Sequence, residues 1–230
     1  MSRGRVLLRR GLAIAALVAV IAAAYLFWFR DLPMFAVEEV EVTGVTANKA
    51  EVTAALEQAG EDMTTLHVRD DELAEAVQPF PTVASISAGT TLPHGLEVTV
   101  TERLPVAEAR LGGQVLPVSA DGFVLVGLEV DEPLPRIEAG ARGAVLDSQG
   151  AAQAAILGAA PKELREQLRA ASWDEARGGV IAGLRGAPEL RFGDGDRAEE
   201  KWEALAAVLA EGASNATYID VSVPERPVAG

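Results

Sequence analysis

The sequence contains no cysteine, and only two of its 230 residues are histidines, His67 and His94. Without cysteine the chain has neither a disulfide framework nor a thiolate metal site. The two histidines fall in different predicted elements and lack the H-x-x-x-H spacing, so a zinc site or a histidine-based triad would need a coincidence of folding. We therefore expect no metal and no cofactor, and we interpret both histidines as ordinary loop or surface residues.

Basic residues are scarce as well, and the formal net charge is -14. Because the first ten residues hold four arginines and no acid, the remainder carries -18. This excess of negative charge argues against nucleic acid and anionic surfaces as partners. The acidic clusters at 38–41 and 70–72 look like carboxylate pairs for acid–base chemistry, but they fall on solvated faces and helix starts. We interpret them as solubilising.

Charge is absent altogether from Gly11 to Phe29. A helix of this length is about 28 Å long, close to the roughly 30 Å of a bilayer's hydrocarbon core, so the stretch predicts a transmembrane helix. The arginines precede it, which places residues 1–10 in the cytoplasm and the rest outside the plasma membrane. A cleaved signal peptide is the alternative, with small residues at 22–24 for processing. The aromatic run at 25–29 favours an uncleaved, single-pass anchor.

Residues 30–104 predict a first unit with the order strand, helix, helix, strand, strand. Apolar residues at helical spacing predict its helices, and alternation of apolar with polar residues predicts its last strand. The predicted strands lie at 35–43, 83–88 and 96–101. The first predicted helix runs from 49 to 58, and the second begins at Asp70 and ends before Pro79.

Residues 105–223 predict a second, β-rich unit with a helical insertion, and 224–230 a C-terminal tail. The predicted strands lie at 107–111, 114–118, 123–126, 180–184, 189–192 and 217–223, and the predicted helices at 147–171 and 197–209. Trp202 shares an apolar helix face with Leu205 and Leu209, which favours a core position over a ligand platform. The fold class is thus α+β.

Short motifs, in their order and spacing along nearly the whole chain, resemble the FtsQ/DivIB family of bacterial cell-division proteins, which carry a POTRA domain after a signal anchor. The motif residues are Gly44, Pro81, Val83, Pro93, Glu102, Arg103, Pro105, Gly122, Gly193 and Lys201. The segment 219–227 closes the match. Residues 116–118 depart from the family pattern, which puts the geometry of that hairpin in question.

The resemblance implies a non-enzymatic scaffold of the division machinery, with the POTRA unit near the membrane and the β-rich unit beyond it. It also implies FtsB/DivIC-like and FtsL-like single-span partners, contacts with other septal wall-synthesis proteins, and concentration at the division septum. In the family, the last strands dock an extended segment of the partner.

The residues of the last predicted strand fit such a docking role. Ile219, Val221 and Val223 alternate with Tyr218, Asp220 and Ser222, so we expect the first three to pack inward while the strand keeps a free edge. Such an edge accepts a partner strand through main-chain hydrogen bonds, with Tyr218 as an anchor. The alternative is that Tyr218 only covers neighbouring strands.

Two other function classes stay open. The first is a membrane-anchored protein that binds or processes peptidoglycan, which the missing nucleophile, base and metal constellation disfavours. The second is a POTRA chaperone of the secretion type. Such chaperones precede a β-barrel, and the residues after the POTRA-like unit show no long series of alternating strands.

Overall fold

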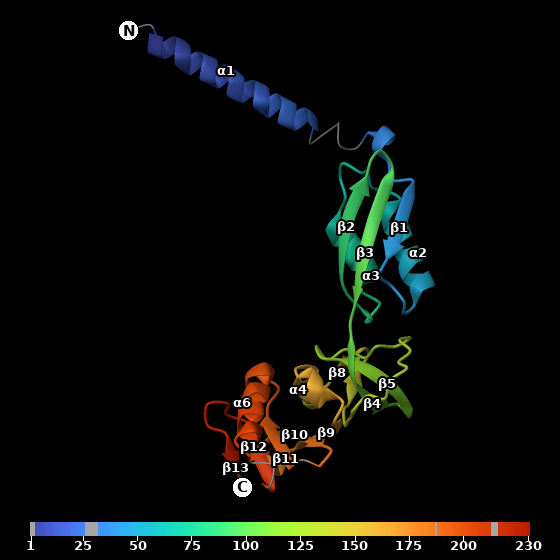
Figure 1. Ribbon diagram of the computed structural model, residues 1–230. Helices are drawn as coiled ribbons and strands as arrows, with labels where there is room; N and C mark the ends of the chain where they lie inside the picture. Colours follow the sequence, from blue (N-terminus) through green and yellow to red (C-terminus); the bar gives the residue numbers. More distant parts are fainter. Residues whose placement is uncertain (1–2, 26–31, 187, 213–215) are drawn as a thin grey trace. The chain divides into compact units, whose positions relative to one another are not determined.

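The computed structural model describes residues 3–25, 32–186, 188–212 and 216–230. The chain divides into a first unit, Met1–Thr101, and a second unit, Glu102–Gly230 (Figure 1). Each unit has its own hydrophobic core. Helices and strands occur in both units, which confirms the predicted α+β class.

The first element is helix α1, Arg3–Ala24. Five of its apolar side chains are at least 60% exposed: Ile14, Leu17, Val18, Val20 and Ile21. Among the described residues, no helix is both long enough and apolar enough to cross a membrane. Residues 26–29 of the predicted anchor lie outside the described part, so the transmembrane helix over 11–29 stays a prediction.

The remaining elements of the first unit follow the predicted order strand, helix, helix, strand, strand. After the short helix η2 (Pro33–Phe35) come β1 (Glu39–Thr43), α2 (Lys49–Gly60), α3 (Asp70–Val77), β2 (Val83–Thr91) and β3 (Gly95–Glu102). The strands form one sheet in the order β1-β3-β2, with β1 parallel to β3. Along β3, Leu96, Val98 and Val100 are buried and the residues between them exposed, as the alternation predicted.

The second unit is built on one eight-stranded sheet with the order β13-β12-β11-β10-β9-β6-β4-β5. Its strands are β4 (Pro105–Leu111), β5 (Gln114–Ser119), β6 (Arg136–Ile137), β9 (Leu168–Asp174), β10 (Gly179–Leu184), β11 (Glu189–Gly193), β12 (Tyr218–Asp220) and β13 (Val228–Ala229). β7 (Ala141–Arg142) and β8 (Val145–Leu146) form a separate pair. The helical elements are α4 (Ser148–Gly158), α5 (Lys162–Arg165), η3 (Glu175–Arg177) and α6 (Ala198–Ala210). Apolar residues of α4 and α6 join those of the sheet in one core.

Trp202 on α6 is a core residue, which confirms that interpretation. Its side chain is 1% exposed, and its ring centroid lies 4.7 Å from that of Phe192 on β11. Its indole Nε1 donates a hydrogen bond to the carbonyl oxygen of Ile156 on α4 at 2.7 Å. The same residue therefore ties α4 and α6 to strand β11 of the sheet.

The predicted helix over 147–171 is wrong in its second half, because the chain forms α4, the single turn α5 and then strand β9. Pro161 lacks an N–H and disfavours the helical conformation of the preceding residue, so α4 cannot continue through it. Arg165 donates hydrogen bonds to the carbonyl oxygens of Gly158 and Ala160, which are left free as the helix ends. Residues 168–171 have helix-like composition, but pairing with β6 and β10 on either side makes them a strand.

Asp147→Ala should destabilise the second unit by about 2 kcal/mol. One carboxylate oxygen accepts a hydrogen bond from the Gly150 N–H and so caps α4 at 2.8 Å, and the other accepts from the Gly140 N–H at 2.8 Å. Loss of a cap costs about 1 kcal/mol, and loss of a second hydrogen bond a similar amount. Urea unfolding measures the change. Asp147→Asn, which keeps one acceptor oxygen, is the control and should lose about half as much.

Candidate functional site

The described residues contain no group of three or more histidine, aspartate or glutamate side chains that could hold a metal ion. His94 instead has its Nδ1 3.0 Å from the carbonyl oxygen of Ala36 and 3.8 Å from the Glu38 carboxylate. This arrangement links the segment before β1 to the loop before β3. The predicted docking residues lie on strand β12 and in the turn that follows it.

β12 pairs along both of its sides. Its residues lie parallel to β11, with Tyr218 opposite Glu189 and Asp220 opposite Arg191. On its other side β13 runs antiparallel, with Ala229 opposite Ile219. The expectation of a free edge is therefore wrong in this structure, because the chain turns back after Pro224 and covers β12 with its own residues 228 and 229.

The predicted strand over 217–223 is also shorter than expected. The Asp220 carboxylate accepts hydrogen bonds from the N–H of Ser222 at 2.9 Å and from its hydroxyl at 2.7 Å, which turns the backbone out of the sheet. Ile219 and Val221 are fully buried, as predicted, whereas Val223 beyond the turn is 52% exposed. The inward-facing set therefore comprises only the first two of the three predicted residues.

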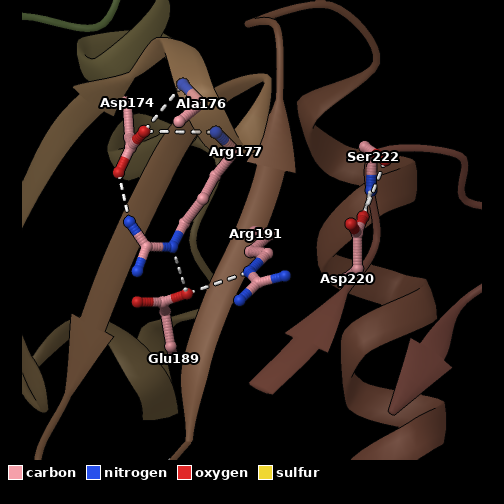
Figure 2. Close-up of polar contacts among 7 residues, drawn as sticks. All are labelled: Asp174, Ala176, Arg177, Glu189, Arg191, Asp220 and Ser222. Carbon is pink, nitrogen blue, oxygen red and sulfur yellow. Dashed lines mark hydrogen bonds and ion pairs between the residues drawn. The ribbon is translucent and has the colours of Figure 1, made fainter. Parts of the chain in front are cut away.

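Tyr218 is half-buried, and the guanidinium of Arg191 lies over its ring at 3.9 Å. A chain of ion pairs holds that guanidinium in place (Figure 2). The Glu189 carboxylate lies 2.9 Å from Arg191 Nε and 3.2 Å from Arg177 Nε, and Arg177 in turn pairs with Asp174. The hydrogen bond from Arg177 lowers the pKa of Asp174. Tyr218 thus sits at the end of a charged row that crosses the sheet face.

The sequence prediction missed Arg177, Glu189 and Arg191. Glu189 and Arg191 flank Leu190 in a strand, so the alternation already indicated that both side chains share the face opposite the core. Their juxtaposition with Tyr218 depends on the parallel register of β11 with β12, which no local pattern encodes.

Two motif pieces of the second unit that are separate in sequence lie in contact. Arg103 Nε donates to the Asp121 carboxylate at 2.7 Å, and its guanidinium lies 3.9 Å from the Phe123 ring centroid. Asp121 precedes Gly122, which has a φ of +82°. Glu102 ends β3, and Pro105 begins β4 opposite Ser119. Residues 116–118 pair with β4 in register, so the departure from the family pattern leaves this hairpin intact.

Lys201 and Gly193 both lie at the turn that ends β11. The ammonium of Lys201, 2% exposed, lies 2.6 Å from the Asp194 carboxylate and 3.0 Å from the Asp194 carbonyl oxygen. Its hydrogen bond lowers the pKa of Asp194. Gly193 has a φ of +72°, and a side chain there would come within 2.9 Å of Ser222 Cβ. These motif residues hold the turn at the end of β11 against the turn that ends β12.

The motif residues of the first unit have structural positions. Gly44 has a φ of +78° and approaches β3 so closely that a Cβ would lie 2.2 Å from the Val100 carbonyl oxygen. Val83 is buried in the core. Pro93 follows a cis peptide bond, and its carbonyl oxygen accepts a hydrogen bond from the Thr65 hydroxyl. Pro81 is half-buried just before β2.

Comparison with known proteins agrees with these motifs. A family model described as "POTRA domain, FtsQ-type" matches residues 35–103. The cell division protein FtsQ of Mycobacterium leprae is 30% identical over 198 residues, which are 85% of this chain and 56% of that protein. The chain belongs to the FtsQ/DivIB family. FtsQ of Streptomyces venezuelae is 26% identical, over 95% of this chain and 83% of that protein.

The FtsQ match gives the fold of the first unit a name: its β-α-α-β-β arrangement is a POTRA domain of the FtsQ type. FtsQ of Mycolicibacterium smegmatis is 28% identical, over 95% of this chain and 65% of that protein. The chain thus spans between about half and two thirds of the length of its two mycobacterial relatives. Its FtsQ-type POTRA domain is followed by a β-rich second unit.

Proposed function

We propose that this FtsQ-family protein is a non-enzymatic scaffold of the division machinery that holds FtsB/DivIC-like and FtsL-like single-span proteins by strand addition at β12. One observation carries the proposal. The side of β12 away from β11 bonds to an antiparallel segment, so its backbone N–H and C=O groups have the geometry to accept a strand. Strand addition supplies affinity through main-chain hydrogen bonds, and side chains such as Tyr218 supply specificity.

The proposal includes a location. Residues 11–29 anchor the chain in the plasma membrane, with residues 1–10 in the cytoplasm and both folded units outside, concentrated at the septum. Support comes from the uncharged run and the preceding arginines. The exposed apolar side chains along α1 would face lipid. An anchored scaffold stays within reach of other single-span proteins, and that proximity raises their effective concentration at its surface.

Tyr218→Glu should weaken retention of the FtsB/FtsL-like pair at least tenfold while leaving the second unit folded. Truncating or charging an aromatic anchor at an interface centre typically costs 2 kcal/mol or more. The new carboxylate would lie beside Arg191, so the fold tolerates it. Co-purification of the pair with full-length chain measures the effect, and circular dichroism checks folding.

Val115→Glu is the matched control for this experiment. Val115 lies on β5, at the other end of the sheet, and is 48% exposed. The Val115→Glu substitution introduces the same charge and should leave retention of the FtsB/FtsL-like pair unchanged. Equal retention by wild type and Tyr218→Glu would contradict docking at β12, and release of muropeptides from peptidoglycan by the purified chain would contradict a non-enzymatic role.

A further inference from the structure

The segment 225–230, here named the return segment, occupies the same side of β12 that the proposed function assigns to a partner. Gly230 and Tyr218 exchange hydrogen bonds: the Tyr218 N–H donates to Gly230 at 3.0 Å, and the Gly230 N–H donates to Tyr218 at 3.1 Å. The N–H of Thr217 also donates to the Gly230 carbonyl oxygen, at 2.6 Å. The return segment therefore satisfies backbone groups that a docked strand would use.

Gly230 also lies against the Tyr218 ring. A Cβ at this position would come within 2.8 Å of the ring atoms, so the position accepts glycine and crowds any larger residue. The ring is thus enclosed by Arg191 on one side of the strand and by a small residue of the return segment on the other. A segment that replaces the return segment needs a glycine or similarly small residue opposite Tyr218.

The return segment is held with little burial. All its residues are exposed, Val228 by 53%, and none of them belongs to the buried core of the described residues. Its side chains contribute an ion pair of Glu225 with Arg197, a residue that also pairs with Glu200. Exposed ion pairs and a few backbone hydrogen bonds contribute weakly compared with core packing. Such a segment can leave without disturbing the core.

Addition of a partner outside β13 is disfavoured by the chemistry of its outer edge. Since Tyr218 and Gly230 form a hydrogen-bonded pair, the backbone groups of the next residue, Ala229, point away from β12. The next outward position is Pro227, which has no N–H to donate. The outer edge of β13 therefore offers one backbone donor, at Ala229. β12 itself offers a regular row of backbone donors and acceptors.

We propose that the return segment is a placeholder strand, which an extended antiparallel segment of the partner must displace to reach β12. This inference rests on the proposed function, because it concerns regulation of the same edge. It assigns the partner a chemistry: an extended segment with a small residue opposite Tyr218. Occupation by the placeholder multiplies the apparent association constant by the fraction of molecules whose edge is free.

A disulfide lock tests the proposal in the full-length chain. Asp220 and Val228 are register partners in an antiparallel pair, where Cα atoms are close enough for a disulfide, and the chain has no cysteine of its own. In the variant Asp220→Cys/Val228→Cys, oxidation fixes the return segment on β12 and reduction frees it. Binding of the purified extracytoplasmic part of the FtsB/DivIC-like protein should be at least tenfold weaker when oxidised. The reduced form of the same variant is the matched control.

Deletion of residues 225–230 is the second arm, and it should strengthen binding about tenfold. Equal binding by the oxidised and reduced lock, or weaker binding after the deletion, would overturn the placeholder role while leaving partner docking in place. Absence of binding by wild type, lock and deletion alike would instead refute the proposed function, and the placeholder with it. Faster exchange of the Tyr218 amide proton in the deletion variant verifies that the return segment had covered it.

Discussion

Gly179→Ala should destabilise the second unit by about 4 kcal/mol, whereas Gly178→Ala beside it should cost only about 1 kcal/mol. Both glycines have positive φ, +82° for Gly178 and +139° for Gly179. A Cβ on Gly178 would meet nothing within 4 Å, but a Cβ on Gly179 would lie 2.2 Å from the Gly193 carbonyl oxygen. The first variant carries backbone strain alone, and the second adds a clash with backbone that cannot rotate away.

Urea unfolding followed by tryptophan fluorescence measures both variants, because Trp202 lies in the core of the affected unit. The adjacent pair is a matched control, since the substitutions are identical in chemistry and differ in the space around them. Equal losses for the two variants would contradict the close approach of β10 to β11. Because β11 carries Glu189 and Arg191, displacing it should also loosen the Arg191 contact with Tyr218 and weaken partner retention.

The elements that local pattern predicts well are those whose sequence and surroundings agree. β3 alternates cleanly between buried and exposed residues, and Gly112-Gly113 joins β4 to β5 with both glycines at positive φ, as a tight two-residue hairpin turn requires. Helix α6 was predicted to within one residue at each end. In these segments the local preference and the tertiary packing favour the same structure.

β9, β12 and the return segment show why the remainder escaped prediction. Residues 168–171 lack both alternation and β-branched residues, so only their neighbours in the sheet define them as a strand. The length of β12 is set by Asp220, whose carboxylate turns the chain at Ser222, whereas the predicted strand continued to residue 223. In the return segment, the pairing residues Val228 and Ala229 are both exposed, and exposed residues leave no hydrophobic pattern from which the pairing could be predicted.

Asp194→Ala should cost the second unit about 3 kcal/mol, more than Lys201→Met, which should cost about 1 kcal/mol. The Lys201 side chain is 2% exposed and the Asp194 side chain 67% exposed. Removal of the carboxylate leaves a buried ammonium with only the backbone carbonyl oxygen of residue 194, and an uncompensated buried charge is strongly destabilising. Removal of the ammonium leaves a carboxylate that water can still solvate, with a methionine of similar length in the core position.

The double variant Asp194→Ala/Lys201→Met completes the cycle and should be about as stable as Lys201→Met alone, because no buried charge is left without its partner. Urea unfolding at neutral pH measures all four proteins. A larger loss for Lys201→Met than for Asp194→Ala would mean that the ammonium's packing and not its charge decides the stability of this turn.

The same pair gives the stability a pH dependence of definite sign. The hydrogen bond from Lys201 lowers the pKa of Asp194 below its ordinary value of 3.8, so the folded state binds this proton less readily than the unfolded chain. The stabilisation is then complete above the unfolded pKa and is lost as the pH falls through the folded one. The stability advantage of wild type over Lys201→Met should therefore shrink as the pH falls below 3.8, although other paired carboxylates lower the stability of both. Because Gly193, the neighbour of Asp194, lies against Ser222 in the turn that ends β12, acid should loosen the docking edge together with this ion pair.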